Sequence, residues 1–131
     1  MAKEVKPHLM FEGDARFAME LYTRVFPNSE IISEEYYGPG EQGAEGSVKT
    51  AVFSLEGQKF ICIDSPAHHD FTFTPSMSIF VDCDDEAELK RAFEILGEGG
   101  KVFMPLDNYG FSTKFGWISD RYGVSWQLNL P

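Results

Sequence analysis

The sequence predicts an α+β fold built from two copies of a β-α-β-β-β module. Two stretches have the apolar spacing of an amphipathic helix, and strand-like runs flank them in the same order in each half. Phe11 and Val81, which precede the two helices, lie 70 positions apart, and so do Phe26 and Leu96, which end them. A repeat of pattern at this long period indicates a duplicated module. We expect one domain over residues 1–131, with modules 1–64 and 76–131 joined by 65–75.

The first module begins with the strand-like run "PHLMF", and a helix follows from Asp14 to Pro27, where proline stops it. The apolar side chains expected on one face of this helix are Phe17, Ala18, Leu21, Tyr22 and Val25. Three further runs, "EIISEEYY", "SVKTAVFSL" and "KFICID", read as strands, and "LEGQ" reads as a compact hairpin turn.

The second module repeats this order with "MSIFVDC", a helix after Asp84, and then "KVFM", "TKFGWIS" and "VSWQLNL". The apolar face of the helix carries Leu89, Ala92, Phe93 and Leu96, and Gly97 is the expected C-cap. An acidic run lies at its N-terminus: Asp82, Asp84, Asp85 and Glu86. Carboxylates there offset the helix dipole and supply an N-cap, which we favour over a pair of catalytic acids.

The net charge of −10 argues against a nucleic-acid partner, because it repels a phosphate backbone and no run of lysine and arginine offsets it. No segment approaches the ~18 apolar residues of a membrane span, so we expect no membrane partner and a cytoplasmic protein. Cys62 and Cys83 lie in strand-like runs without the spacing of a zinc knuckle. We expect two buried, reduced thiols.

The glycine-rich stretch "GPGEQGAEG" at 38–46 lacks the lysine and the serine or threonine of a phosphate loop. Because it lies between two strands, we expect a mobile hairpin loop.

Four stretches together resemble the PhnB-like branch of the vicinal oxygen chelate superfamily, which includes glyoxalase I, bleomycin-resistance proteins and extradiol dioxygenases. They are "HLMFEGDARFAMELYTRVFPNSEI", "FSLEGQKFICID", "SMSIFVDCDDEAELKRAFEIL" and "DRYGVSWQLNLP". The resemblance implies two βαβββ modules whose mixed, curved sheets form a small-molecule cavity, usually in a homodimer. Some relatives carry the label of a ubiquinone-pathway methyltransferase, but no glycine-rich turn here follows a strand and opens a helix.

The resemblance also implies where a divalent metal would be held: by histidines on the first and fifth strands, a glutamate on the eighth and, in glyoxalases, an acid on the fourth. In this sequence His8 keeps the first position, and the eighth is Gln127. The fifth falls on Ser76, or on Met77 if the register slips by one, and the fourth on Phe60, with Asp64 farther along. Amide and hydroxyl groups are poor ligands for transition metals. We therefore expect no cofactor; a divalent metal held by His8 and Gln127 is the alternative.

Strand alternation predicts which side chains line the cavity. The inward positions that alternation predicts are His8, Met10, Ser76, Ser78, Phe80, Ser125, Gln127 and Asn129. We expect Phe60 and Asp64 of the fourth strand to line the cavity as well. Val124, Trp126, Leu128 and Leu130 would then pack against a helix. Hydroxyl and amide groups with aromatic neighbours suit a small-molecule pocket, although the same polar residues could simply face water.

We therefore expect a protein that binds a small organic molecule, with or without chemistry, and without the superfamily metal. The alternative is a metal-dependent lyase, isomerase or dioxygenase with a degenerate chelating site. A sequestering resistance protein is a third possibility. The catalytic residues are unknown: His8 and Asp64, or Tyr36, Tyr37 and Tyr109, could act as acid or base, but none forms a recognisable spacing. No serine lies in a "GxSxG" elbow.

The joining stretch "SPAHHDFTFTP" contains adjacent histidines, His68 and His69. Neighbouring side chains in an extended chain point to opposite sides, so the two could hardly chelate one ion. We expect Phe71 and Phe73 to be buried anchors for the crossover. One histidine, but not both, could then reach over the cavity mouth toward His8 and Gln127.

Overall fold

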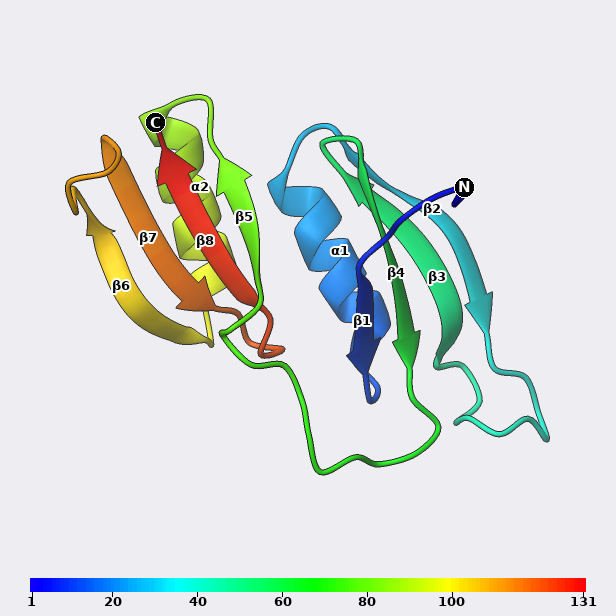
Figure 1. Ribbon diagram of the computed structural model, residues 1–131. Helices are drawn as coiled ribbons and strands as arrows, with labels where there is room; N and C mark the ends of the chain where they lie inside the picture. The colour runs from blue at the N-terminus through cyan, green and yellow to red at the C-terminus, as the bar shows by residue number, and fades with distance from the viewer. The chain divides into compact units, whose positions relative to one another are not determined.

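The computed structural model describes all 131 residues and divides into two compact units, Met1–Thr72 and Phe73–Pro131 (Figure 1). The boundary falls inside the stretch 65–75. Each unit contains one helix and one four-stranded mixed sheet, so the α+β prediction is confirmed. Neither helix is long and apolar enough to cross a membrane.

The first unit has the sheet order β1-β4-β3-β2, in which β1 is parallel to β4 and the other pairs are antiparallel. Its elements are β1 (His8–Phe11), α1 (Ala15–Val25), β2 (Ser29–Tyr36), β3 (Val48–Leu55) and β4 (Gln58–Asp64). The hairpin between β3 and β4 turns through Glu56 and Gly57, with φ of 48° and 86°. Positive φ at both central residues matches the right-handed twist of the strands, and glycine adopts it without strain.

The second unit repeats this topology with the order β5-β8-β7-β6 and a parallel β5–β8 pair. Its elements are β5 (Ser78–Asp82), α2 (Glu86–Gly97), β6 (Lys101–Asp107), β7 (Lys114–Ser119) and β8 (Ser125–Leu130). The predicted β-α-β-β-β order is therefore confirmed in both halves. β6 runs three residues past the predicted run, through Pro105. An edge strand tolerates proline because its outward side needs no ladder hydrogen bond.

The edge strands are short or irregular. β1 and β5 have four and five residues. β2 shifts register between Ile31 and Ser33 and near its end, and β6 shifts between Val102 and Met104 and again before Asp107. These irregularities are β-bulges, which bend a strand and interrupt its ladder.

Helix α1 buries a stripe that differs from the predicted one. The buried side chains are Ala15, Ala18, Met19, Leu21, Tyr22 and Val25. Phe17 is 58% exposed, so its predicted place on the core face is wrong. At 100° per residue Phe17 lies about 120° from the centre of the stripe, just outside the buried face, and Met19 packs in the core instead.

Helix α2 begins with the N-cap that the acidic run predicts. The Asp85 carboxylate accepts from the Glu88 N–H at 2.8 Å, and the Glu88 carboxylate accepts from the Asp84 N–H at 3.0 Å. These reciprocal bonds satisfy backbone donors that the first turn leaves free. At the other end the C-cap is Glu98 rather than Gly97, and the left-handed residue is Gly99, with φ of 76°.

A buried aspartate ties together the loops of each unit. Asp64 accepts from the backbone N–H groups of Gly13 at 2.8 Å, Ala15 at 3.0 Å and Val48 at 2.9 Å. It therefore joins the end of β4 to the start of α1 and to β3. In the second unit Asp120 accepts from the N–H groups of Tyr122 and Val124 and from the Trp126 indole N–H. Both aspartates are 3% exposed, and these donors replace the water that burial removes.

Candidate functional site

The sheet of the second unit has one covered and one open face. Trp126 and Leu128 of β8 are fully buried on the side of α2. Gly116 of β7 lies on the same side, because a Cβ added there would meet the Phe93 ring of α2 at 2.7 Å. The alternate residues of β7 and β8 therefore point the other way, onto what we call the open face.

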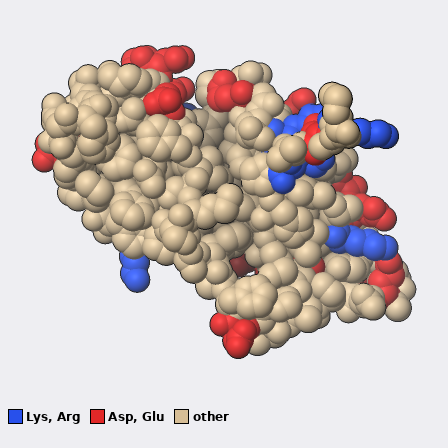
Figure 2. Space-filling view, in the orientation of Figure 1, with Lys and Arg blue, Asp and Glu red and all other residues tan.

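Strand register arranges the open face in rows that run across β5, β8, β7 and β6. The three rows are Ser78–Ser125–Ser119–Lys101, Phe80–Gln127–Trp117–Met104 and Asp82–Asn129–Phe115–Asp107. Paired residues share one face of a sheet, so each row is a line of neighbouring side chains. In Figure 1 α2 lies behind this sheet, and Figure 2, in the same view, shows few charged side chains over its middle.

A hydrogen-bond network joins the first two rows. The hydroxyls of Ser78 and Ser125 lie 2.6 Å apart, and the Trp117 indole N–H donates to the Ser125 oxygen at 2.8 Å. The Gln127 amide N–H donates to the Ser78 oxygen at 3.2 Å. These bonds hold the Trp117 and Gln127 side chains in place, while the Gln127 side-chain oxygen, Oε1, has no protein donor and can accept a hydrogen bond from a ligand.

Aromatic rings surround Phe115 at the other end of the open face. The rings of Phe111, Tyr109 and Phe80 lie 5.0, 6.2 and 6.4 Å from the ring of Phe115. Phe115 is buried, whereas Phe80 is 53% and Phe111 is 64% exposed. Phe103 adds a further ring 5.2 Å from that of Trp117. Exposed rings next to a satisfied polar network are typical of a small-molecule binding surface.

The first unit presents different side chains on the corresponding face of its sheet. His8 pairs with Ile61 and Met10 with Ile63, just as Ser78 pairs with Ser125 and Phe80 with Gln127. The face is therefore largely aliphatic. Only His8 among these four residues of the first unit carries a polar side chain.

The correspondence between the β1–β4 pair and the β5–β8 pair changes the positions predicted for the site on the fourth and fifth strands. His8 corresponds to Ser78, so Ser76 is not the fifth-strand position; Ser76 precedes β5, is exposed, and its hydroxyl bonds that of Thr74 at 2.7 Å. Gln127 corresponds to Ile63, so the fourth-strand position is Ile63 rather than Phe60. The predicted positions, Ser76 and Phe60, therefore lie two and three residues before the corresponding ones, Ser78 and Ile63.

Phe60 and Asp64 lie on the α1 side of the first sheet, opposite His8 and Met10. Phe60 is buried and stacks on Phe53, with ring centroids 5.1 Å apart. Both Asp64 oxygens are occupied by backbone N–H groups. Neither side chain therefore lies on the face to which the sequence assigned it. By contrast, Ser78, Phe80, Ser125, Gln127 and Asn129 all lie on the open face.

The sequence-based list missed residues that complete the open face: Asp82, Phe111, Phe115 and Trp117. The first lies on β5 and was interpreted only as part of the acidic run. Trp117 and Phe115 lie on β7, whose alternation alone does not say which face is inward. Its antiparallel pairing with β8 supplies that information, because Trp117 is opposite Gln127 and Phe115 is opposite Asn129.

The four strand positions at which the resemblance implies metal ligands hold one imidazole, one aliphatic group, one hydroxyl and one amide: His8, Ile63, Ser78 and Gln127. Anionic oxygen, thiolate and imidazole ligands are the groups that hold divalent transition metals, and this set contains one of them. No three His, Cys, Asp or Glu side chains lie together so as to hold a metal ion elsewhere. These residues do not fit the superfamily metal.

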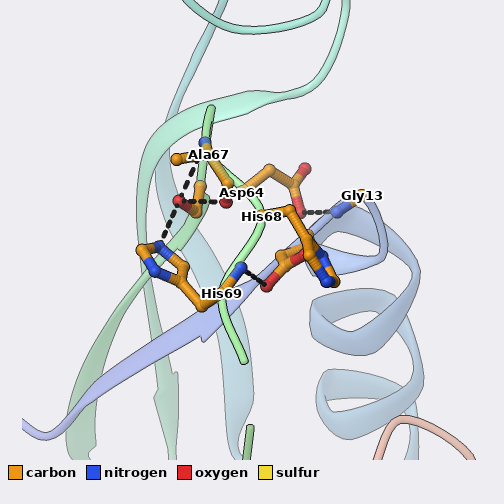
Figure 3. Close-up of polar contacts among 7 residues, drawn as sticks. Gly13, Asp64, Ala67, His68 and His69 are labelled. Carbon is orange, nitrogen blue, oxygen red and sulfur yellow. Dashed lines mark hydrogen bonds and ion pairs between the residues drawn. The ribbon is translucent and has the colours of Figure 1, made fainter. Parts of the chain in front are cut away.

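Glu12 fastens the joining stretch to the first unit through hydrogen bonds with His68 and His69, the two histidines labelled in Figure 3. One Glu12 oxygen lies 2.7 Å from His68 Nδ1, and the other accepts from the His69 backbone N–H at 3.2 Å. The hydrogen bond from His68 lowers the pKa of the Glu12 carboxyl. The His69 ring instead bonds the Ser65 hydroxyl at 2.9 Å, so the two histidine rings have different partners.

The aromatic residues of this stretch do not both serve as buried anchors. Phe71 is 60% exposed and stacks on the His69 ring at 4.8 Å, which contradicts the prediction. Phe73 is half-buried and would contact a Cβ added at Gly123 at 3.9 Å. Phe73 therefore lies beside the turn at Gly123 and is half-buried rather than buried as predicted.

The two cysteines are free and buried, as predicted. Burial raises the pKa of Cys62 to about 12 and that of Cys83 to about 11. Both thiols therefore stay protonated near neutral pH, and neither is an activated nucleophile.

Comparison with known proteins places the chain in a family. A family model described as 3-demethylubiquinone-9 3-methyltransferase matches residues 3–129. The PhnB protein from Bacillus cereus is 50% identical, with a TM-score of 0.96, over 98% of this chain and 100% of that chain. Protein PA1353 from Pseudomonas aeruginosa is 27% identical, with a TM-score of 0.85, over 98% of each chain.

Protein YjdN from Escherichia coli (strain K12) is 23% identical over 139 residues, covering 96% of this chain and 94% of that protein. A glyoxalase/bleomycin resistance protein/dioxygenase domain from Frankia shares the fold, at 14% identity with a TM-score of 0.65 over 99% and 98% of the two chains. The chain belongs to the PhnB-like family matched by this family model, and it shares the fold of the glyoxalase/bleomycin-resistance/dioxygenase proteins.

Proposed function

We propose that the protein binds a small organic molecule on the open face of the second unit, without the superfamily metal. One observation carries this proposal: the bonded network of Ser78, Ser125, Trp117 and Gln127 lies beside exposed aromatic rings. The rings offer stacking surface, and the Gln127 carbonyl offers an acceptor that fixes a ligand's orientation.

The residues favour binding over the methyl transfer in the family description. A nucleotide cofactor needs a glycine-rich turn that opens a helix, because the helix N-terminus binds its anionic groups. The glycine-rich stretch 38–46 instead connects the antiparallel strands β2 and β3. Its base is closed by bonds from Tyr37 N–H to Ser47 C=O and from Gly46 N–H to Tyr37 C=O, both 2.9 Å.

The two tryptophans provide a test, since both lie in the second unit on opposite faces of its sheet. We would screen metal-stripped protein against a library of aromatic fragments that carry a hydrogen-bond donor, using saturation-transfer NMR. Hits should change the emission of the wild-type protein through Trp117. In Trp117→Phe the remaining emission, from buried Trp126, should not respond to the same compounds.

Two results would oppose the proposal. One is a set of hits whose emission change persists in Trp117→Phe, since the ligand would then lie elsewhere. The other is binding that requires added Mn²⁺, Ni²⁺, Zn²⁺ or Fe²⁺ and is lost in His8→Ala. Affinities that are equal with EDTA and with each metal would support metal-free binding.

A further inference from the structure

We propose that the ligand of the open face is an organic cation: an ammonium or similar group attached to a flat apolar body. This inference rests on the proposed function and names the class of ligand. It comes from the third row of the open face, where carboxylates lie at both ends and aromatic rings lie between and above them.

The row places Asp82 on β5 and Asp107 on β6 with Asn129 and Phe115 between them. Three strand spacings separate the carboxylates, a distance of roughly 14 Å. Both aspartates are exposed, and neither makes an ion pair with a lysine or arginine. Their partners are neutral: the Asp82 carboxylate accepts from the Asn129 side chain, and the Asp107 carboxylate accepts from the Asn108 backbone N–H at 2.7 Å.

Hydrogen bonds hold the aromatic loop between β6 and β7 against this row. The Ser112 hydroxyl donates to the Asn129 side-chain oxygen Oδ1 at 2.5 Å, and the Asn129 side-chain nitrogen Nδ2 donates to the Asp82 carboxylate at 2.9 Å. The Tyr109 hydroxyl donates to the Pro105 carbonyl at 2.6 Å. Phe111 and Tyr109 are thus positioned beside the carboxylates without a ligand, which lowers the entropy cost of binding.

The charges near this row have one sign. Lys114, which follows the loop on β7, binds Glu86 of α2 at 2.6 Å and so points to the covered side. Lys101 lies in the first row, two rows away. Aromatic faces attract a cation, and the net charge of −10 adds a long-range attraction, so the surface is complementary to a cation and repels an anion.

Three probes that share one ring and differ in charge would test this inference. They are benzyltrimethylammonium, benzyl alcohol and benzenesulfonate, titrated into the whole chain by NMR at 20 mM and 500 mM NaCl. We expect the cation to bind about tenfold more tightly than the alcohol at low salt and the sulfonate to bind weakest. The preference should shrink at high salt, because exposed charges are screened.

The variant for this test is Asp82→Asn/Asp107→Asn, which removes both charges and keeps the shape of the side chains. It should reduce the preference for the cation, measured as the ratio of its affinity to that of benzyl alcohol, to about twofold. The matched control is Glu45→Gln/Glu94→Gln, which changes the net charge equally at exposed positions in the β2–β3 loop and on α2. It should keep most of the preference.

The outcomes separate this inference from the function on which it rests. If the three probes bind equally and Trp117 emission responds, the cation inference is overturned and the binding site stands. If no probe binds and the fragment screen finds no ligand through Trp117, both fail. If the aspartate variant changes the sedimentation coefficient of the protein, the row is an interface between copies, and the inference is also overturned.

Discussion

The open face of the second sheet and the corresponding face of the first are built on the same strand pairing but carry different chemistry. Where the first unit has Met10 and Ile63, the second has Phe80 and Gln127. The backbone repeat therefore supplies two equivalent sheet faces, and only the face of the second unit carries this hydrogen-bonded network of side chains. The difference shows that the repeated backbone fixes where each side chain points, while the residue at each position decides whether the face carries polar groups.

The largest effect should be seen in the buried thiols, one in each unit. Because burial raises the pKa of both, the thiolate appears only as the pH rises toward 11 or 12, and at pH 8 almost none is present. We expect iodoacetamide to alkylate the native thiols about a thousandfold more slowly than in urea-unfolded protein. Cys62 should react roughly tenfold more slowly than Cys83, given about one unit between their pKa values.

Mass spectrometry of peptides from timed reactions would measure both rates, with the unfolded protein as the control. Native rates within tenfold of the unfolded rates would mean that the thiols are reached by water far more easily than the structure allows.

The next effect concerns the buried aspartates. Replacing Asp64 or Asp120 by alanine leaves three donors without acceptors in the affected unit, so the free energy of unfolding should fall by about 3 kcal/mol. Urea denaturation followed by far-ultraviolet circular dichroism would measure the loss. Asparagine at the same positions keeps one acceptor oxygen and should cost less. A loss below about 1 kcal/mol for either alanine variant would contradict the structural role.

The smallest effect exchanges the residues that distinguish the two faces. Gln127→Ile gives the second sheet the residue of the first and should weaken binding of the fragment hits about tenfold, since the acceptor is lost. Ile63→Gln is the matched control and should leave their affinity unchanged. Titration by NMR would compare the two variants. Equal losses of affinity in the two variants would show that the corresponding faces of both sheets contribute alike to binding.

The sequence predicted the order and approximate bounds of all eight strands, because alternation and turn residues are local signals. It placed Ser125, Gln127 and Asn129 on one face for the same reason, since buried Trp126 and Leu128 mark the other face. The acidic run likewise predicted an N-cap, which the structure places at Asp85.

Features that depend on pairing between strands could not be predicted in this way. Phe60 and Asp64 were assigned to the wrong face, because a strand of alternating apolar residues can be read in either register. The partner of β4 decides the matter, since His8 pairs with Ile61. Trp117 was missed because only its pairing with Gln127 of β8 shows that it lies on the open face.

The bulged edges described above have a consequence for solubility. An exposed, regular edge strand invites another chain to add a strand, which leads to aggregation. Here β1 and β5 are too short for a long ladder, and β2 and β6 are interrupted by bulges. β2 also carries three exposed glutamates, Glu30, Glu34 and Glu35, which would repel a like-charged copy. Neither sheet therefore offers another chain a long, regular edge to which it could add a strand.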